Sequence, residues 1–185
     1  DFEDGYAVEP EQVAANVAQA ARTGIAGLSI EDSARAGDEP LLPFDLAVER
    51  IRSARRAIDE TGTRVLLTGR SEGFVVGRPD IGETIRRLRA YAEAGADCLY
   101  APRISTPEHL TAIVEAVAPK PVNLLINAPF MTVAEAAQLG ARRISVGGTL
   151  AKTAWGGFLD AAREIAEQGT FSGFEELPNV DSLLG

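Results

Sequence analysis

The sequence of 185 residues contains a single cysteine, Cys98, and a single histidine, His109. One cysteine excludes a disulfide within the chain and a zinc site built from several thiolates. One histidine excludes a site with several histidine ligands and the HExxH motif of zinc peptidases. Catalysis by this chain would therefore depend on carboxylates, arginines, hydroxyl groups or a metal ion that prefers oxygen ligands.

The sequence also lacks long apolar runs and an excess of positive charge. No stretch approaches the ~18 consecutive apolar residues that a membrane span needs, so we expect no membrane partner and a cytoplasmic location. Lys and Arg total 18 against 27 Asp and Glu, which gives a net charge of −9. Because such a surface repels nucleic-acid phosphates, we expect no nucleic-acid partner. A small anionic substrate would need an arginine or a metal ion to bind.

A repeated pattern runs along the chain, in which a segment with helical periodicity is followed by a short apolar run. The apolar runs predict strands at residues 25–30, 65–67, 98–100, 122–126 and 144–146. The periodic segments predict helices at residues 10–22, 44–60, 82–94, 107–118, 132–139 and 151–168. This alternation is typical of parallel α/β folds. No GxGxxG or GxxxxGK[ST] motif follows a strand, which argues against dinucleotide-binding and P-loop folds.

The segment before the first predicted helix, "DFEDGY", reads as the polar end of one further strand. A closed (β/α)8 barrel has eight strands and typically about 250 residues. We therefore expect an α/β fold of the TIM-type (β/α)8 class that lacks roughly its first two βα units and most of strand 3, with an open sheet as the alternative. The partial catalytic barrel would occupy residues 1–170, and residues 171–185 would form a tail that docks on a neighbouring subunit.

In parallel barrels, functional residues lie at the carboxyl ends of the strands. Asp1, Glu3 and Glu31 follow two neighbouring predicted strands, and crowded carboxylates repel one another unless a cation neutralises them. Such oxygen ligands fit Mg²⁺ or Mn²⁺ held largely through water. Arg70 follows the next strand, and its guanidinium group suits a substrate carboxylate. Together these residues predict a site that stabilises the enolate of a 2-oxo acid.

Several of these positions allow other interpretations. A carboxylate just after a strand is often a helix N-cap, a role that Asp32 would suit. Gly147 and Gly148 predict either a tight turn into the last helix or a phosphate site. A phosphate-binding barrel enzyme that uses this glycine pair, or a barrel without catalytic activity, therefore stays open as an alternative function. The arginine pairs at residues 55–56, 86–87 and 142–143 predict solvated surfaces.

Four blocks of the sequence, "DFEDGYA", "GLSIEDS", "LLTGRSEGF" and "AYAEAGADCLY", resemble in order the signature blocks of the isocitrate lyase/phosphoenolpyruvate mutase superfamily. The resemblance covers most of residues 1–170. It implies a (β/α)8 barrel whose last helix is swapped between the subunits of a homodimer or homotetramer. It also implies a Mg²⁺-dependent (or Mn²⁺-dependent) lyase or hydrolase that cleaves a C–C or P–C bond adjacent to a 2-oxo or 2-hydroxy acid through a metal-bound enolate.

Carried over by position, the resemblance implies roles for individual residues. The acids of the metal site correspond to Asp1, Glu3 and Glu31. The catalytic residues would be Arg70, which holds the substrate carboxylate, and Glu72, which orients Arg70 or a water molecule. The other implied substrate-binding residues are Tyr6 and Asn127.

The sequence departs from the family pattern in the loop after Glu31. The segment "DSARAGDEPLLPF" contains neither the KxCGH motif of isocitrate and methylisocitrate lyases nor the lysine-bearing loop of the mutases. Pro102 stands about where the lyases carry a glutamate, and Glu3 stands where aspartate is commoner. These departures argue against the two lyase activities, place the chain on a side branch of the superfamily, and leave the general acid unidentified.

Overall fold

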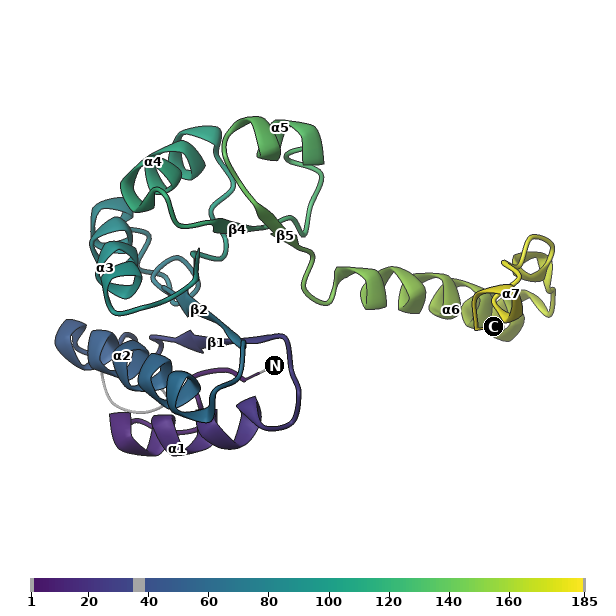
Figure 1. Ribbon diagram of the computed structural model, residues 1–185. Coiled ribbons are helices and arrows are strands. Elements are labelled where there is room, and N and C mark those ends of the chain that lie inside the picture. The colour runs from purple at the N-terminus through teal and green to yellow at the C-terminus, as the bar shows by residue number, and fades with distance from the viewer. Residues whose placement is uncertain (1, 35–38, 185) are drawn as a thin grey trace. The chain divides into compact units, whose positions relative to one another are not determined.

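Figure 1 shows a computed structural model of the chain, which describes residues 2–34 and 39–184. The chain forms two compact units, Asp1–Ser145 and Val146–Gly185. The first unit contains the sheet with five helices, and the second contains a long helix with the C-terminal tail. The boundary that we predict at residue 170 therefore falls within the second unit.

Five parallel strands form the sheet in the order β1-β2-β3-β4-β5. Their bounds are β1 Gly27–Glu31, β2 Leu66–Arg70, β3 Cys98–Tyr100, β4 Val122–Leu125 and β5 Arg143–Ser145. Strands that are consecutive in the chain are neighbours in the sheet, as in a (β/α)8 barrel. The structure confirms the predicted parallel α/β fold, and each predicted apolar run overlaps one strand.

The helices alternate with the strands along the chain (Figure 1). Their bounds are α1 Pro10–Ala21, α2 Phe44–Thr61, α3 Ile81–Glu93, α4 Pro107–Val117 and α5 Val133–Gln138. The hydroxyl groups of Thr106 and Thr132 accept main-chain N–H bonds at the starts of α4 and α5, so both helices begin with a side-chain cap. Gly62 ends α2 in the left-handed conformation, with φ of 68°.

The two faces of the sheet differ in chemistry because successive side chains of a strand point to opposite faces. One set of alternating residues is apolar and packs in the core with the helices: Leu28, Ile30, Leu67, Leu99, Val122 and Leu124. The other set is mostly polar and is aligned across the strands by the register: Ser29, Glu31, Thr68, Arg70, Cys98, Tyr100, Asn123 and Arg143. We call this second set the polar face of the sheet.

The second unit is built around α6, Thr149–Gln168, followed by the turn Ser172–Phe174 and α7, Asp181–Leu184. The large apolar side chains of α6 are exposed: Leu150, Trp155, Phe158 and Leu159. The Glu164 carboxylate accepts hydrogen bonds from the Thr170 hydroxyl at 2.5 Å and from the main-chain N–H of Ser172 at 2.7 Å. These bonds lower the pKa of Glu164 to about 2. No helix in the described ranges is both long and apolar enough to cross a membrane.

Gly69 of β2 lies so close to α3 that a side chain would not fit. An added Cβ would stand 2.9 Å from the Cβ of Tyr91 and 3.2 Å from the Cβ of Ala96. We expect Gly69→Ala to lower the free energy of unfolding by about 1–3 kcal/mol, measured by urea denaturation, because the helix must shift. Gly148→Ala at the N-cap of α6 is the matched control, since its φ is −81° and nothing lies within 4 Å of its added Cβ. Equal stability of the two variants would contradict this account of the packing.

Candidate functional site

Charged side chains gather where β1 and β2 end. Glu31 and Arg70 are the last residues of the two strands and are partners in the parallel register. The Nη1 atom of Arg70 lies 2.7 Å from Oε1 of Glu31, and its Nε atom lies 2.5 Å from Oε1 of Glu72. The guanidinium group also lies over the ring of Tyr100, 5.1 Å from the ring centroid. Arg70 is therefore held on three sides, while no described residue pairs with its Nη2 atom.

Burial and neighbouring charges both act on the pKa of the two glutamates. Burial raises the pKa of Glu31, Arg70 lowers it, and the neighbouring carboxylates of Glu72, Glu3 and Asp4 raise it further. Burial also raises the pKa of Glu72, and the hydrogen bond from Arg70 opposes that rise. Glu31 and Glu72 flank Arg70, and Glu3 and Asp4 lie within electrostatic reach of Glu31. Carboxylates gathered in this way are a setting in which a divalent cation with oxygen ligands would be stabilised.

The structure places two of the three predicted metal ligands. Glu31 donates its main-chain N–H to the carbonyl oxygen of Glu3 at 3.1 Å. This bond holds the N-terminal segment, which forms a turn at residues 3–6, beside β1. Asp1 lies outside the described residues. Among the residues that the structure describes, no group of three acidic, histidine or cysteine side chains is arranged to hold a metal ion, so a cation here would be bound partly through water.

The two remaining predicted substrate residues are exposed. Tyr6, which has a positive φ of 56°, packs edge-to-face on Phe2 with 5.5 Å between the ring centroids. Asn127 lies just beyond β4, and its side chain makes no hydrogen bond within residues 2–34 and 39–184. Within those same ranges, Arg70 is joined to neither of them.

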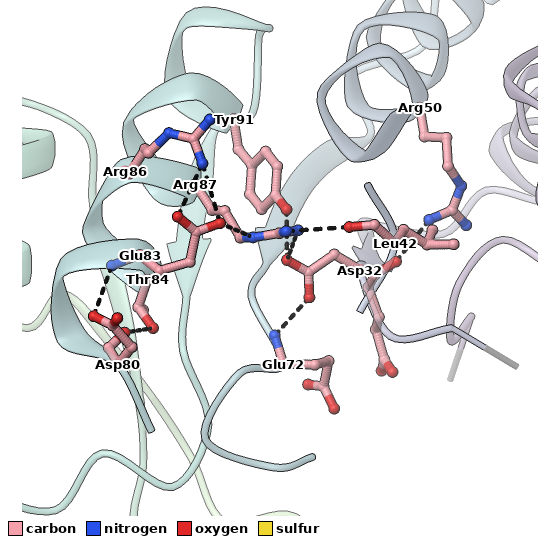
Figure 2. A network of polar contacts seen from close by, with 11 residues as sticks. Asp32, Leu42, Arg50, Glu72, Asp80, Glu83, Thr84, Arg86, Arg87 and Tyr91 are labelled. Carbon is pink, nitrogen blue, oxygen red and sulfur yellow. Dashed lines mark hydrogen bonds and ion pairs between the residues drawn. The ribbon is translucent and has the colours of Figure 1, made fainter. Parts of the chain in front are cut away.

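Asp32 forms the centre of a buried polar network that the sequence did not reveal (Figure 2). Its Oδ1 atom accepts the main-chain N–H of Glu72 at 2.7 Å. Its Oδ2 atom accepts the hydroxyl of Tyr91 at 2.5 Å and Nη1 of Arg87 at 3.2 Å. Burial raises the pKa of Tyr91 well above its ordinary value, and the Asp32 charge raises it further, so Tyr91 stays a neutral donor. The network thereby holds the main chain that carries the Glu72 side chain.

The interpretation of Asp32 as a helix N-cap is wrong. Helix α2 begins at Phe44, and Pro43 occupies the N-cap position. Asp32 is only 2% exposed and is separated from that helix by a loop. A short polar side chain after a strand can serve either as a helix N-cap or as a buried acceptor. The contacts of Arg87 and Tyr91 of α3 with Asp32 decide for the second role.

Arg87 connects the same network to the loop after β1. Its Nη2 atom donates to the carbonyl oxygen of Leu42 at 3.1 Å, and the N–H of Leu42 donates to the carbonyl oxygen of Asp32 at 2.9 Å. The prediction of a solvated pair at residues 86–87 is wrong for Arg87, which is 6% exposed. Its spacing of four residues from Tyr91, on the apolar stripe of α3, was the available signal.

Arg50 of α2 ties the N-terminal segment to β1. Its Nη1 atom donates to the carbonyl oxygen of Glu31 at 2.8 Å. Its Nη2 atom donates to the carbonyl oxygens of Asp4 and, at 2.9 Å, Ala7. Arg50 was not among the predicted site residues, although its spacing from Ala47 places it on the buried stripe of the helix. Arg50 therefore helps to hold the acidic N-terminal segment beside Glu31, together with the bond from the Glu31 N–H to Glu3.

The glycine pair after β5 forms a turn into α6. Gly147 has a positive φ of 54°, and Gly148 is the N-cap residue of the helix. The sequence allowed either a tight turn or a phosphate site at these glycines. The described residues show the turn and no further feature that indicates phosphate binding.

Comparison with protein families gives one match that covers most of the chain. Residues 1–166 match the family model described as phosphoenolpyruvate phosphomutase. Among curated proteins, an uncharacterised protein found in two strains of Mycobacterium tuberculosis is 34% identical over 148 residues, which cover 80% of this chain and 53% of that protein. The chain thus spans about half the length of the curated relatives that it matches.

Solved structures with the same fold include enzymes. A candidate lyase or mutase of Burkholderia cenocepacia J2315 is 40% identical with a TM-score of 0.92, over 98% of this chain and 66% of that one. Oxaloacetate acetylhydrolase, solved with its product oxalate, is 25% identical with a TM-score of 0.85, over 100% of this chain and 64% of that one. Phosphonopyruvate hydrolase, solved with oxalate and Mg²⁺, is 24% identical with a TM-score of 0.81, over 100% of this chain and 66% of that one. At this identity the similarity shows a shared fold.

Asp32→Asn tests whether the buried carboxylate holds this site together. The amide that replaces the carboxylate cannot accept at both of its atoms, while Arg87 keeps its ion pair with Glu83 at 2.8 Å. We therefore expect the free energy of unfolding to fall by about 1–3 kcal/mol. The measurement is urea denaturation of the intact protein followed by circular dichroism. Asp45→Asn makes the same chemical change on the surface of α2 and should stay within about 0.5 kcal/mol of the wild type. A similar loss in both variants would count against a special role for Asp32.

Proposed function

Because the chain belongs to the phosphoenolpyruvate phosphomutase family, we propose that its protein is a Mg²⁺-dependent lyase or hydrolase. Its substrate would be a small 2-oxo or 2-hydroxy acid, and the bond cleaved would be the C–C or P–C bond next to that group. The observation that carries this proposal is the cluster of Glu31, Arg70 and Glu72 at the carboxyl ends of β1 and β2. Oxalate in the structure of oxaloacetate acetylhydrolase supports a carboxylate ligand.

In this proposal Arg70 binds the substrate carboxylate. Its Nη2 atom is the donor that no described residue uses, and a guanidinium group can bind a carboxylate through two N–H groups. Glu72 orients Arg70 through the 2.5 Å contact to Nε. Asp32 in turn holds the main chain of Glu72. The substrate-binding donor is thus positioned by contacts that exist before the substrate arrives, which lowers the cost of binding.

The donor chemistry near Glu31 fits Mg²⁺, although it does not form a closed cage. Glu31 and Glu3 would hold the ion together with Asp1, largely through water, as Mg²⁺ commonly binds. When bound, Mg²⁺ would neutralise the negative charge that develops on the substrate oxygens. Glu31 now pairs with Arg70 at 2.7 Å. A cation at Glu31 and a substrate carboxylate at Arg70 would replace that ion pair together, so the binding of each should favour the other.

Oxalate, which mimics the enolate of pyruvate, tests the proposed site. In calorimetric titration of the intact protein we expect oxalate to bind with Mg²⁺ and to bind at least roughly tenfold more weakly without it, because the two ligands are coupled. Glu31→Gln should weaken binding in Mg²⁺ to a similar degree. Glu60→Gln, the same change at an exposed position of α2, should have no effect. Absence of binding in both conditions would remove the basis for an enolate site.

We also propose that the intact protein is a homodimer or homotetramer in which α6 packs on a second copy of the chain. Support comes from the second unit itself, where Trp155 and Phe158 are each 60% exposed or more and pack edge-to-face at 5.3 Å. Exposed aromatic residues clustered on one helix face are typical of a contact surface. This assignment agrees with the swapped helix that the family resemblance implies.

The double substitution Trp155→Glu, Phe158→Glu tests the proposed contact surface. Burying two carboxylates in an apolar interface is unfavourable, so we expect a shift to a smaller species in light scattering coupled to size-exclusion chromatography. Glu167→Lys, on another side of α6, should leave the mass unchanged. A double variant that keeps the wild-type mass would overturn the assignment.

A further inference from the structure

Arg143, the first residue of β5, carries a positive charge that the site described above does not use. Its register partner is Asn123, whose partner on the next strand is Tyr100, and Tyr100 is in turn the partner of Arg70. Register partners in a parallel sheet share a face. Arg143 and Arg70 therefore both belong to the polar face of the sheet, at positions aligned by one continuous register.

No described residue pairs with the charge of Arg143. Arg70 lies between two carboxylates, whereas the guanidinium group of Arg143 makes no ion pair or hydrogen bond within residues 2–34 and 39–184. Its register partner Asn123 has a buried side-chain oxygen without a hydrogen-bond partner. This oxygen lies on the adjacent strand, but the guanidinium group of Arg143 does not donate a hydrogen bond to it. The chain has a net charge of −9, so an unpaired arginine on this face is unusual. Such an arginine is suited to binding an anionic ligand.

Both arginines act on the same phenol group. Burial is the largest influence on the pKa of Tyr100 and raises it, while a hydrogen bond with Ser145 and the charges of Arg70 and Arg143 lower it. The two cations therefore lie within electrostatic reach of one side chain, although they come from strands on either side of it. The charge of Arg143 also lowers the pKa of Cys98, which burial raises and which belongs to the same polar face.

We propose that Arg143 is a second anion-binding residue of the same site, and that it binds the acid group of the substrate that Arg70 does not hold. The inference rests on the proposed function, because it presumes a substrate carboxylate at Arg70. It makes Arg143 a determinant of specificity. The substrate would be a small acid with an anionic group at each end, a dicarboxylate or a phosphonocarboxylate, and acids with one anionic group would bind weakly.

The test compares two ligands of equal carbon number, malate and 2-hydroxybutyrate, in calorimetric titrations of the intact protein with Mg²⁺. Malate has a second carboxylate where 2-hydroxybutyrate has a methyl group. Arg143→Gln should weaken malate binding roughly tenfold to hundredfold, the range for a lost hydrogen bond to a charged group. It should leave the affinity for 2-hydroxybutyrate unchanged. The affinity for oxalate should also stay unchanged, because oxalate mimics the enolate and both of its adjacent carboxylates would lie at the metal ion and Arg70.

Arg142→Gln is the matched control, because Arg142 donates to the carbonyl oxygens of Ala137 and Ala141 instead. It should change none of the three affinities. Arg143→Lys retains the charge, so it should keep part of the malate affinity, and it keeps the test decisive if the glutamine variant does not fold.

Three outcomes would overturn the inference. Unchanged malate binding in Arg143→Gln would show that Arg143 does not contact the second acid group. An equal loss for malate and oxalate would show a general effect of charge or folding instead of specificity. A wild-type protein that binds no oxalate in Mg²⁺ would remove the proposed function together with the inference, whereas normal oxalate binding with insensitive malate binding would remove the inference alone.

Discussion

The buried carboxylate of Asp32 is the interaction on which the geometry of the candidate site depends. It follows Glu31 directly, accepts the N–H of Glu72, and receives Arg87 and Tyr91 from α3. A carboxylate removed from water is stable only if its hydrogen bonds and its counter-charge remain in place. Asp32 therefore couples the end of β1 to the loop after β2 and to α3. This coupling positions Glu31 and Glu72 on either side of Arg70.

The two faces of the sheet carry different kinds of side chains. On one face, apolar side chains of the strands pack against the helices and bury the core. On the other face, acids, arginines and hydroxyl groups are aligned by the same register. Because a strand alternates its side chains, both rows come from the same short segments. A change of register by one residue would exchange them, so the core packing also decides which groups reach the site.

The elements themselves could be predicted from the sequence, because the signals that produce them are local. Apolar runs, helical periodicity and glycines at helix ends act over a few residues, and they located all five strands and the helices between them. The family blocks pointed to Glu31, Arg70 and Glu72, which the structure brings into contact. The alternation within the runs was harder to see, since Cys98 and Tyr100 of the polar face read as part of an apolar stretch.

The sequence by itself determined the order and type of the elements and the residues that end the strands. Only the tertiary structure decided which polar residues are buried and what they hold. Asp32 finds its partners 40, 55 and 59 residues away, and Arg50 reaches a carbonyl 46 residues away. Local rules suggested a helix cap for Asp32 and a solvated surface for Arg87. Burial reverses such assignments, because a charge that leaves water takes whichever partners the packing of distant segments supplies.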